Sequence, residues 1–345
     1  MDSRTGVRMR ADMADQPGWL RGLDDRRVEV AQALAGQVLG IPGPGLWTLA
    51  RGSSAHAASM VAPWLARAVG APVPALRVDA VLSEPAALPA PGATVIVISQ
   101  SGRTPDVVDA ARRLRSAGCR VVALVNERGA LASEASYVLE LGVGAERAIP
   151  ATKTVLAQVA LLWLLGIEAA SQRGGPNGAK RQVVVEPLVD AVADALADTV
   201  PVDRAVERLA SAPPVAGTGR GVTGGLAAEW AHKVMETSGL PIYAASAPEL
   251  AHGPVAIATS GRSVVGFAVG TAARRTVADV LSRAEARGAE TALVAPGGTI
   301  QLPQDELPGL LAGLVRAQML AERMAVAFGQ DPDTAFGLAK VTATP

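Results

Sequence analysis

The sequence predicts an α/β protein with mostly parallel strands, and three observations support this fold class. Apolar residues make up 49% of the 345 residues but aromatic residues only 3%, so Ala, Val and Leu must fill the interior, as they do where helices cover buried strands. Short β-branched runs alternate with segments of helical period, which is typical of crossover units. Part of this order returns in the second half of the chain.

The first half can be divided into elements in chain order. Residues 8–37 contain helical segments interrupted at Gln16-Pro17-Gly18, and the Pro- and Gly-rich residues 41–45 lead into a domain. Hydrophobic periodicity and the positions of Gly and Pro then predict the following elements: a strand at 46–50, a loop at 51–54, a helix at 55–69, a strand at 95–99, a polar loop at 100–104, a helix at 105–117 ended by Gly118, strands at 120–125 and 137–141, and a buried helix at 155–167.

The second half reads as a second copy of the first. The stretch 172–180, QRGGPNGAK, is the best candidate for a linker. Beyond it, residues 265–295 can be laid over residues 95–125 with a constant offset, matching strand, loop, helix, glycine and strand. Arg220 to Thr223 likewise fall near the position of Arg51 to Ser54. The sequence therefore predicts an internal duplication.

Composition argues against several classes of protein. Lys and Arg number 32 and so do Asp and Glu, which removes the attraction that nucleic-acid or anionic-membrane binders display. Cys119 is the only cysteine, so no intramolecular disulfide forms and a reducing compartment is expected. The N-terminus lacks a signal-peptide core, and the apolar run at 155–167 is short for a membrane span. We expect a cytoplasmic protein.

The loop from Ser99 to Thr104 is a candidate anion site. It joins the end of a buried strand to a helix N-terminus, where free N–H groups and the helix dipole favour a phosphate, and hydroxyls at 99, 101 and 104 could complete the shell. Ser53 and Ser54 occupy a comparable turn, and both turns would open at the same edge of the sheet. Helix capping by Ser and Thr is the alternative, but two such turns in one domain favour a phosphate site.

The second half supplies candidate catalytic groups. A helix at 225–238 places Glu229, Lys233 and Glu236 on one face, and this spacing alone favours a solvated salt-bridge face. His252 stands in the turn PELAHGP, where it could shuttle protons or serve only as a structural histidine. No spacing among the three histidines or the single cysteine supports a metal site, and no cofactor is suggested.

The C-terminal tail from Asp331 to Lys340 mixes polar and apolar residues. It could fold back as a lid that delivers Lys340 into a covered site, where an amine forms an imine with a carbonyl. Composition alone favours a disordered tail with a solvated lysine.

The pattern as a whole resembles the two-domain sugar isomerase (SIS) family, which includes the isomerase half of glutamine–fructose-6-phosphate aminotransferase and stand-alone glucosamine-6-phosphate deaminases. Six segments in the family's order carry the resemblance: ARGSSAHAA (50–58), ISQSGRTPD (98–106), ERAIPATKT (146–154), KVMETSG (233–239), PELAHGP (248–254) and GLAKVT (337–342). The chain departs from the family at Ala251, beside the histidine, and at Ala335 and Phe336 in the tail, where the family carries basic residues.

The resemblance implies a fold of two tandem three-layer α/β/α sandwiches, each with a parallel five-stranded sheet, assembled as a homodimer. It implies that Glu236 moves the proton between C1 and C2 and that His252 assists ring opening, often across a dimer interface. Lys340 would meet the open-chain carbonyl. The residues implied to bind the sugar phosphate are Ser53, Ser54, Ser99, Gln100, Ser101, Thr104, Ala151, Thr152 and Lys153.

The expected organisation is an N-terminal helical segment (1–38), a first SIS domain (39–171), a linker and connecting helix (172–200), a second SIS domain (201–330) and the tail (331–345). The expected function is that of a phosphosugar isomerase or deaminase acting on a phosphorylated hexose or hexosamine such as glucosamine-6-phosphate, without glutaminase activity or a cofactor. A fructosamine-6-phosphate deglycase and a non-catalytic sugar-phosphate-binding regulator are the alternatives.

Overall fold

The computed structural model describes residues 5–31, 45–172 and 184–334, which form two compact units. Unit 1 consists of the described parts of Met1–Arg21, Glu146–Leu156 and Val185–Lys340, and unit 2 of the described parts of Gly22–Ala145 and Ala157–Val184. The chain therefore enters unit 1 three times. The consecutive domain ranges given above remain a prediction, and all but Gln172 of the proposed linker lies outside the described residues.

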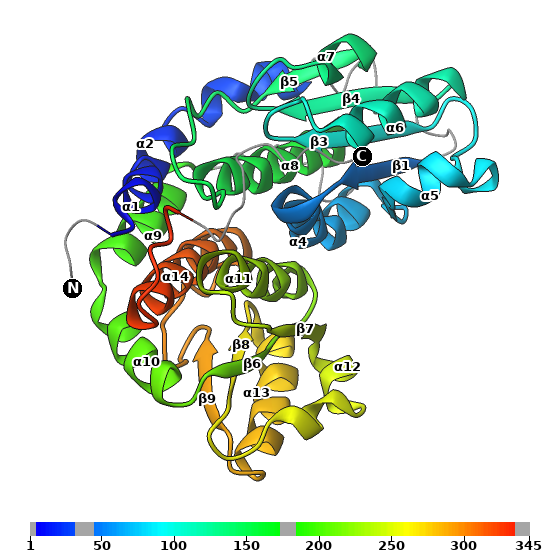
Figure 1. Ribbon diagram of the computed structural model, residues 1–345. Coiled ribbons are helices and arrows are strands. Elements are labelled where there is room, and N and C mark those ends of the chain that lie inside the picture. Colours follow the sequence, from blue (N-terminus) through cyan, green and yellow to red (C-terminus); the bar gives the residue numbers. More distant parts are fainter. Residues whose placement is uncertain (1–4, 32–44, 173–183, 335–345) are drawn as a thin grey trace. The chain divides into compact units, whose positions relative to one another are not determined.

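Unit 2 contains a five-stranded parallel sheet in the order β2-β1-β3-β4-β5 (Figure 1). Its strands are β1 (Leu46–Ala50), β2 (Ala75–Leu76), β3 (Thr94–Ser99), β4 (Arg120–Val125) and β5 (Tyr137–Glu140). Its helical segments are η1 (Asp24–Arg26), α4 (Gly52–Val69), α5 (Val78–Ser83), η2 (Pro85–Ala87), α6 (Pro105–Ser116), α7 (Leu131–Glu134) and most of α8 (Lys153–Gln172). β3 is buried along its whole length, as expected of a strand with helices on both faces.

The order of strands in unit 2 creates a reversal point between β1 and β3. The chain leaves β1 for β2 on one side, and it leaves β3 for β4 on the other. β1 and β3 are parallel neighbours, with Ala50 opposite Ile98, so the turns that follow them lie at the same edge of the sheet. In open α/β sheets this is where a ligand-binding crevice forms.

Unit 1 contains a second parallel sheet in the order β7-β6-β8-β9. Its strands are β6 (Pro214–Gly219), β7 (Tyr243–Ser246), β8 (Ser263–Phe267) and β9 (Glu290–Val294). Its helical segments are α1 (Val7–Ala14), α2 (Gln16–Leu20), α9 (Glu186–Ala197), α10 (Val200–Ser211), α11 (Val222–Ser238), α12 (Ala247–Ala251), η3 (Pro254–Ile257), α13 (Thr271–Glu285) and α14 (Glu306–Ala327), together with the start of α8.

The order of these four strands repeats that of β2, β1, β3 and β4 in unit 2. β8, α13 and β9 occupy the positions that the offset between residues 95–125 and 265–295 predicts. The expectation of five strands in this second sheet is wrong for the described residues. After β9 the chain turns at Pro296 and Gly297, and it returns to the sheet only through one bridge between Val294 and Ile300.

The helices of unit 1 cover opposite faces of its sheet. Along β6, a Cβ added to Gly217 would touch Trp230 of α11, whereas the neighbouring Ala216 belongs to a core cluster formed with α12 and α13. Phe267 of β8 contacts Trp230 as well. Because successive residues of a strand point to opposite faces, α11 lies on one face and α12 and α13 lie on the other.

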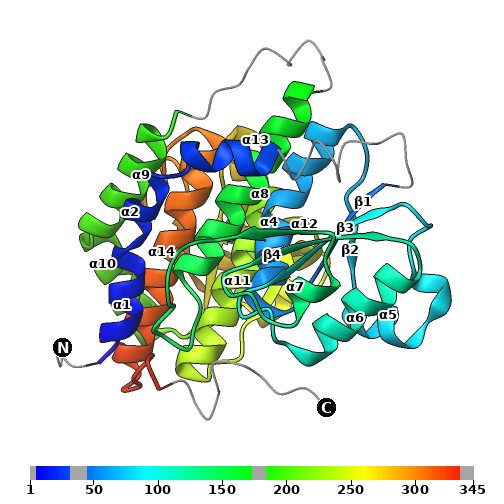
Figure 2. The same ribbon diagram turned by 90° about the horizontal axis from the view of Figure 1, so that it is seen from above.

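The N-terminal helices pack within unit 1, α1 against α14 and α2 against α9 (Figure 2). Their partners are thus far away in the sequence.

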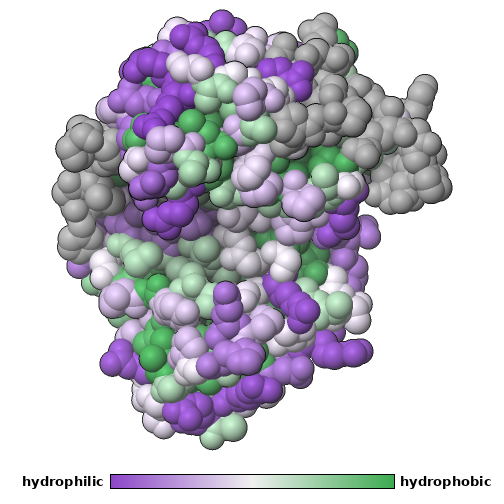
Figure 3. Space-filling view, turned by 90° about the vertical axis from the view of Figure 1, so that its right-hand side faces the viewer, coloured by the Kyte–Doolittle hydropathy of each residue, from purple (hydrophilic) through white to green (hydrophobic). Residues whose placement is uncertain are grey.

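Helix α8 is long and apolar enough to cross a membrane over residues 153–171, but 89% of this stretch is buried inside the protein, in agreement with the predicted buried helix. On the face drawn in Figure 3, hydrophilic and hydrophobic residues are interspersed.

Candidate functional site

The turn after β1 begins the helix α4 earlier than the sequence pattern predicts. The predicted loop at 51–54 is shorter, because α4 starts at Gly52 and places Ser53 and Ser54 in its first turn. No side chain caps this helix, so its first N–H groups have no partner within the helix. Ser54 is buried, and its hydroxyl accepts a hydrogen bond from Gln158 Nε2 at 3.1 Å.

The loop after β3 is a tight turn around Gly102, whose φ is +60°. A Cβ at this glycine would lie 2.7 Å from the carbonyl oxygen of Glu127 and 2.9 Å from the nitrogen of Gly129. Ser99 Oγ accepts from the N–H of Gly102, and Ser101 Oγ accepts from the N–H of Arg103, each at 3.2 Å. These two serines therefore support the loop itself.

Thr104 and Gln100 complete this loop. Thr104 is the N-cap residue of α6, yet its side chain makes no capping hydrogen bond. Gln100 Nε2 lies 3.5 Å from Glu127 Oε1. The capping alternative is therefore not realised at Thr104 or at the start of α4, which leaves two uncapped helix N-termini beside the reversal point. Such ends bind anions.

Arg51 ties these two helix starts together. Its guanidinium donates to Asp106, a buried residue in the first turn of α6, and to Asp79 Oδ1 of α5 at 2.8 Å. Arg51 follows β1 directly, so the ion pair fixes the turn after β1 against the helix after β3. Sequence reasoning did not single out Arg51 or Asp106 for this role.

The charged face of α11 is buried, so the solvated face favoured by its spacing is wrong. Glu229 and Lys233 have side chains 0% and 1% exposed, and Glu236 is 21% exposed. Lys233 Nζ lies 3.6 Å from Glu229 Oε1 and donates to Glu236. Helix α11 packs against α14, and helical spacing alone cannot reveal whether such long-range packing leaves a face buried or exposed.

Glu236 is held in its ionised form. Burial by itself would raise its pKa, but the charge of Lys233 and the hydrogen bond from His232 outweigh burial and lower the pKa to about 2. His232 Nε2 lies 3.1 Å from Glu236 Oε1. Burial opposes the charged form of Lys233 too, yet Glu229 and Glu236 raise the pKa of its amine above the usual value. The cluster thus presents a charged, partly exposed carboxylate beside a buried cation.

The segment that leads into α8 is organised by Glu146. This buried carboxylate accepts from the N–H groups of Thr152, Lys153 and Thr154 at 2.9 to 3.1 Å, and from the hydroxyls of both threonines. Glu146 therefore caps α8 and occupies its anion-binding end. Thr152 and Lys153 are buried, whereas Ala151 is partly exposed.

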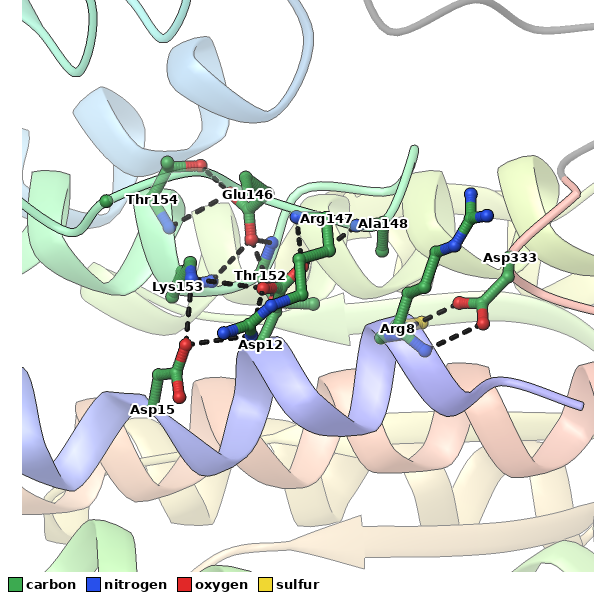
Figure 4. Close-up of polar contacts among 12 residues, drawn as sticks. Arg8, Asp12, Asp15, Glu146, Arg147, Ala148, Thr152, Lys153, Thr154 and Asp333 are labelled. Atoms are coloured by element: carbon green, nitrogen blue, oxygen red, sulfur yellow. Dashed lines mark hydrogen bonds and ion pairs between the residues drawn. The ribbon is translucent and has the colours of Figure 1, made fainter. Parts of the chain in front are cut away.

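Lys153 is held by an acidic pair on and beside α1 (Figure 4). Its Nζ lies 3.0 Å from Asp12 Oδ1 and 2.9 Å from Asp15 Oδ2. Burial opposes the charge of Lys153, but these carboxylates raise the pKa of its amine. Asp12 is fully buried and also accepts from the N–H groups of Arg147 and Ala148. Sequence patterns gave no signal for these contacts, which span more than 130 residues.

His252 lies apart from Glu236 within unit 1. It is exposed at the end of α12, where its N–H bonds back to Pro248 and Glu249. It lines a cavity of about 370 Å³ together with Thr276, Asp279 and Arg283 of α13 and with residues of α12. Since α11 and α12 cover opposite faces of the sheet, one chain does not bring the imidazole to the Glu236 carboxylate.

The other predicted residues are distributed as follows. Ser53, Ser54, Ser99, Gln100, Ser101 and Thr104 belong to unit 2, and Ala151, Thr152, Lys153, Glu236 and His252 belong to unit 1. Lys340 lies outside the described residues.

Within the part of the chain that the structure describes, no group of three or more His, Cys, Asp or Glu residues is arranged to hold a metal ion.

Comparison with known proteins identifies the class. Residues 46–168, from β1 to α8, match the model of the SIS domain. Residues 46–168 thus correspond to a SIS domain, and the described chain contains two parallel sheets. It resembles glutamine–fructose-6-phosphate aminotransferase [isomerizing] of Aeropyrum pernix, with 37% identity over 268 residues. This match covers 72% of the chain and 43% of the relative, so the chain spans less than half of the relative's length.

Solved structures show the same architecture. The C-terminal domain of glucosamine-fructose-6-phosphate aminotransferase from Francisella tularensis superposes with a TM-score of 0.84 over 96% of this chain and 99% of that one, at 18% identity. A protein from Silicibacter pomeroyi, provisionally assigned as a phosphosugar isomerase, superposes with a TM-score of 0.81 over 94% and 99% of the two chains, at 28% identity.

Proposed function

We propose that this protein is a phosphosugar isomerase or deaminase acting on an amino-sugar phosphate such as glucosamine-6-phosphate. The deaminase reaction consumes glucosamine-6-phosphate and water and releases fructose-6-phosphate and ammonia. The names of the similar proteins from Aeropyrum pernix and Silicibacter pomeroyi support the substrate class. The observation that carries the proposal is Glu236, an ionised, partly exposed carboxylate flanked by Lys233 and His232. A protein that only binds sugar phosphates has no evident need for the full set of Glu236, His252 and Lys340.

The proposed roles follow from the resemblance to the SIS family given above. In unit 2, the uncapped ends of α4 and α6 and their hydroxyls bind the phosphate, whose charge suits the positive ends of helix dipoles. In unit 1, the Glu236 carboxylate takes the proton from C2 of the open-chain sugar and returns it to C1. Lys340 supplies the amine that meets the carbonyl group.

His252 is proposed to act on the site of a second copy in a homodimer. The argument is the separation of layers in unit 1, where α11 carries Glu236 on one face of the sheet and α12 carries His252 on the other. This separation does not matter if the imidazole that opens the sugar ring comes from His252 of the other chain. Mixed dimers of Glu236→Gln and His252→Ala chains would then recover activity that neither variant shows alone.

The test is to incubate the purified chain with glucosamine-6-phosphate and to measure ammonia and fructose-6-phosphate. Glu236→Gln is expected to lower kcat by roughly 10²-fold to 10⁴-fold, while Glu207→Gln, which changes an exposed residue of α10, serves as the matched control. The same assay is run with fructosamine-6-phosphate. Turnover of this substrate and not of glucosamine-6-phosphate would identify the protein as a deglycase. Binding of a sugar phosphate measured by calorimetry, without turnover of any substrate, would instead identify a regulator and overturn the proposed enzymatic function.

A further inference from the structure

The Glu236 carboxylate is bound on both of its oxygens by side chains of its own helix. Lys233 Nζ donates to Oε2, and His232 Nε2 lies 3.1 Å from Oε1. The two partners differ in environment, because the Lys233 side chain is 1% exposed and that of His232 is 30% exposed. A carboxylate has about four acceptor sites, so one donor on each oxygen fixes its plane and leaves other acceptor sites for a substrate.

The backbone that carries Glu236 is fixed without any contribution from His232. Glu236 lies in the last turn of α11. The next residue, Thr237, donates from Oγ1 to the carbonyl of Lys233 at 2.8 Å and lies 3.4 Å from the carbonyl of Ala321 in α14. A glutamate side chain still has several rotatable bonds between its Cα and its carboxylate. The direction of the carboxylate is therefore set by the side chains that bind it, Lys233 and His232.

Lys233 is shared between two carboxylates, so it does not serve Glu236 alone. Its Nζ also lies 3.6 Å from Oε1 of Glu229, whose side chain is 0% exposed. The amine thus attracts the Glu236 carboxylate toward the interior of unit 1. His232 binds the same carboxylate from the more exposed side. We infer that the partly exposed position of Glu236, with 21% of its side chain accessible, depends on His232.

The order of this pair is not the one that helix stability favours. A carboxylate in the last turn of a helix faces the negative end of the helix dipole. At a spacing of four residues, an acidic residue that follows its basic partner gives the weaker of the two orientations. His232 precedes Glu236 by four residues, so both effects act against the pair as a device for stabilising α11. The arrangement favours a role in presenting the carboxylate.

We propose that His232 is a positioning residue of this enzyme, which by holding Oε1 of Glu236 aims the carboxylate at C2 of the sugar. The proton passes from C2 to Glu236 and then to C1, while His232 keeps its N–H and exchanges no proton with the sugar. This inference rests on the proposed function for the role of Glu236 as the base. The contact between the two side chains stands on described residues of unit 1 alone.

The first test compares turnover of glucosamine-6-phosphate by the full-length variants. His232→Leu removes the donor and is expected to lower kcat about tenfold to hundredfold with KM nearly unchanged. In His232→Gln the amide nitrogen lies as many bonds from Cα as Nε2 does and still donates, although it carries no titratable proton, so kcat should return to within about threefold of wild type. Met235→Leu, at an exposed residue of α11, is the matched control.

Two results of this comparison overturn the inference. One is an equal kcat for His232→Leu and wild type. The other is a His232→Gln variant that is no faster than His232→Leu, because the imidazole would then be needed for its own proton and not for the hydrogen bond that it donates.

Glucosamine-6-phosphate carrying deuterium at C2 separates positioning from general damage to the fold. The base acts where the C2–H bond breaks, so the isotope effect on kcat should be at least as large in His232→Leu as in wild type. An isotope effect that disappears in the variant would show that a different step has become limiting, and it would overturn the positioning role.

A double-mutant cycle tests the contact without any substrate. Urea unfolding at pH 7 of His232→Leu, Glu236→Leu and the double variant is expected to give a coupling of about twofold to fivefold in the unfolding equilibrium constant. Zero coupling overturns the inference, whatever the turnover. A wild type that turns over no sugar phosphate overturns the proposed function and the positioning role with it, and the cycle still reports whether the two side chains interact.

Discussion

Lys233 Nζ lies 3.6 Å from Glu229 Oε1 in the interior of unit 1, and neither side chain is more than 1% exposed. The same amine donates to Glu236 one turn further along α11. A single cation therefore contacts two carboxyl groups that differ in exposure, one sealed from solvent and one partly exposed. The ionised state of Glu236 depends on this shared partner.

Lys233→Met is expected to destabilise the protein by about 3–5 kcal/mol, because it leaves buried carboxylates without their cation. The measurement is urea unfolding at pH 7. The double variant Lys233→Met/Glu229→Gln serves as control and should regain part of the loss, since it removes the deepest uncompensated charge. A loss below about 1 kcal/mol in the single variant would mean that the cluster is not charged in the fold.

The stability of Glu236→Gln relative to wild type is expected to depend on pH. The folded pKa of Glu236, about 2, lies below its usual value of 4.5, so its ionisation stabilises the fold above pH 4.5 and this contribution is lost as the pH falls through 2. We expect Glu236→Gln to cost roughly 1–3 kcal/mol at pH 7 and the difference to shrink between pH 4.5 and 2. Thermal unfolding across this range checks it, and a difference independent of pH would contradict the assigned pKa.

Gly102→Ala is expected to distort the loop after β3. Its φ of +60° and the nearby backbone of Glu127 and Gly129 leave no room for a methyl group, so the substitution should cost roughly 1–3 kcal/mol and weaken phosphate binding measured by calorimetry. Gly224→Ala in α11 is the matched control, since a Cβ there meets nothing within 4 Å and alanine favours a helix by about 1 kcal/mol. Equal effects of the two substitutions would argue against a strained turn.

Asp12→Asn and Asp15→Asn form a matched pair that differs in burial. Asp12 is 0% exposed and Asp15 is 44% exposed, although both contact Lys153 and Arg147. We expect a loss of about 2–4 kcal/mol for Asp12→Asn and at most about 1 kcal/mol for Asp15→Asn, measured by denaturant unfolding. Similar losses at both positions would show that the burial of Asp12 is unimportant.

Local patterns predicted the elements whose boundaries are set by their own residues. The strands at 46–50 and 120–125 have the predicted bounds, because continuous apolar runs define buried strands. The start of α4 was placed three residues late, since Gly52, Ser53 and Ser54 form a polar first turn that apolar periodicity does not detect. The shared order of strands in the two sheets was accessible through the repeat.

Properties that depend on distant contacts were not predictable. Helical spacing placed Glu229, Lys233 and Glu236 on one face but could not reveal that this face is largely buried. The pairing of Asp12 with Arg147 and Lys153, and of Asp333 with α1, joins residues far apart in the sequence. The roles of the candidate residues toward a substrate came from family resemblance and remain predictions.

The long-range anchoring of α1 has a consequence for folding during synthesis. Residues 7–14 are synthesised before Glu322, Asp331 and Asp333, which follow more than 300 residues later. At about 5–20 residues per second, this helix waits on the order of 15–60 seconds for its permanent neighbours. The nascent chain must therefore shield α1 or leave it unformed, and a premature stop before α14 removes the partners of α1 as well as α14 itself.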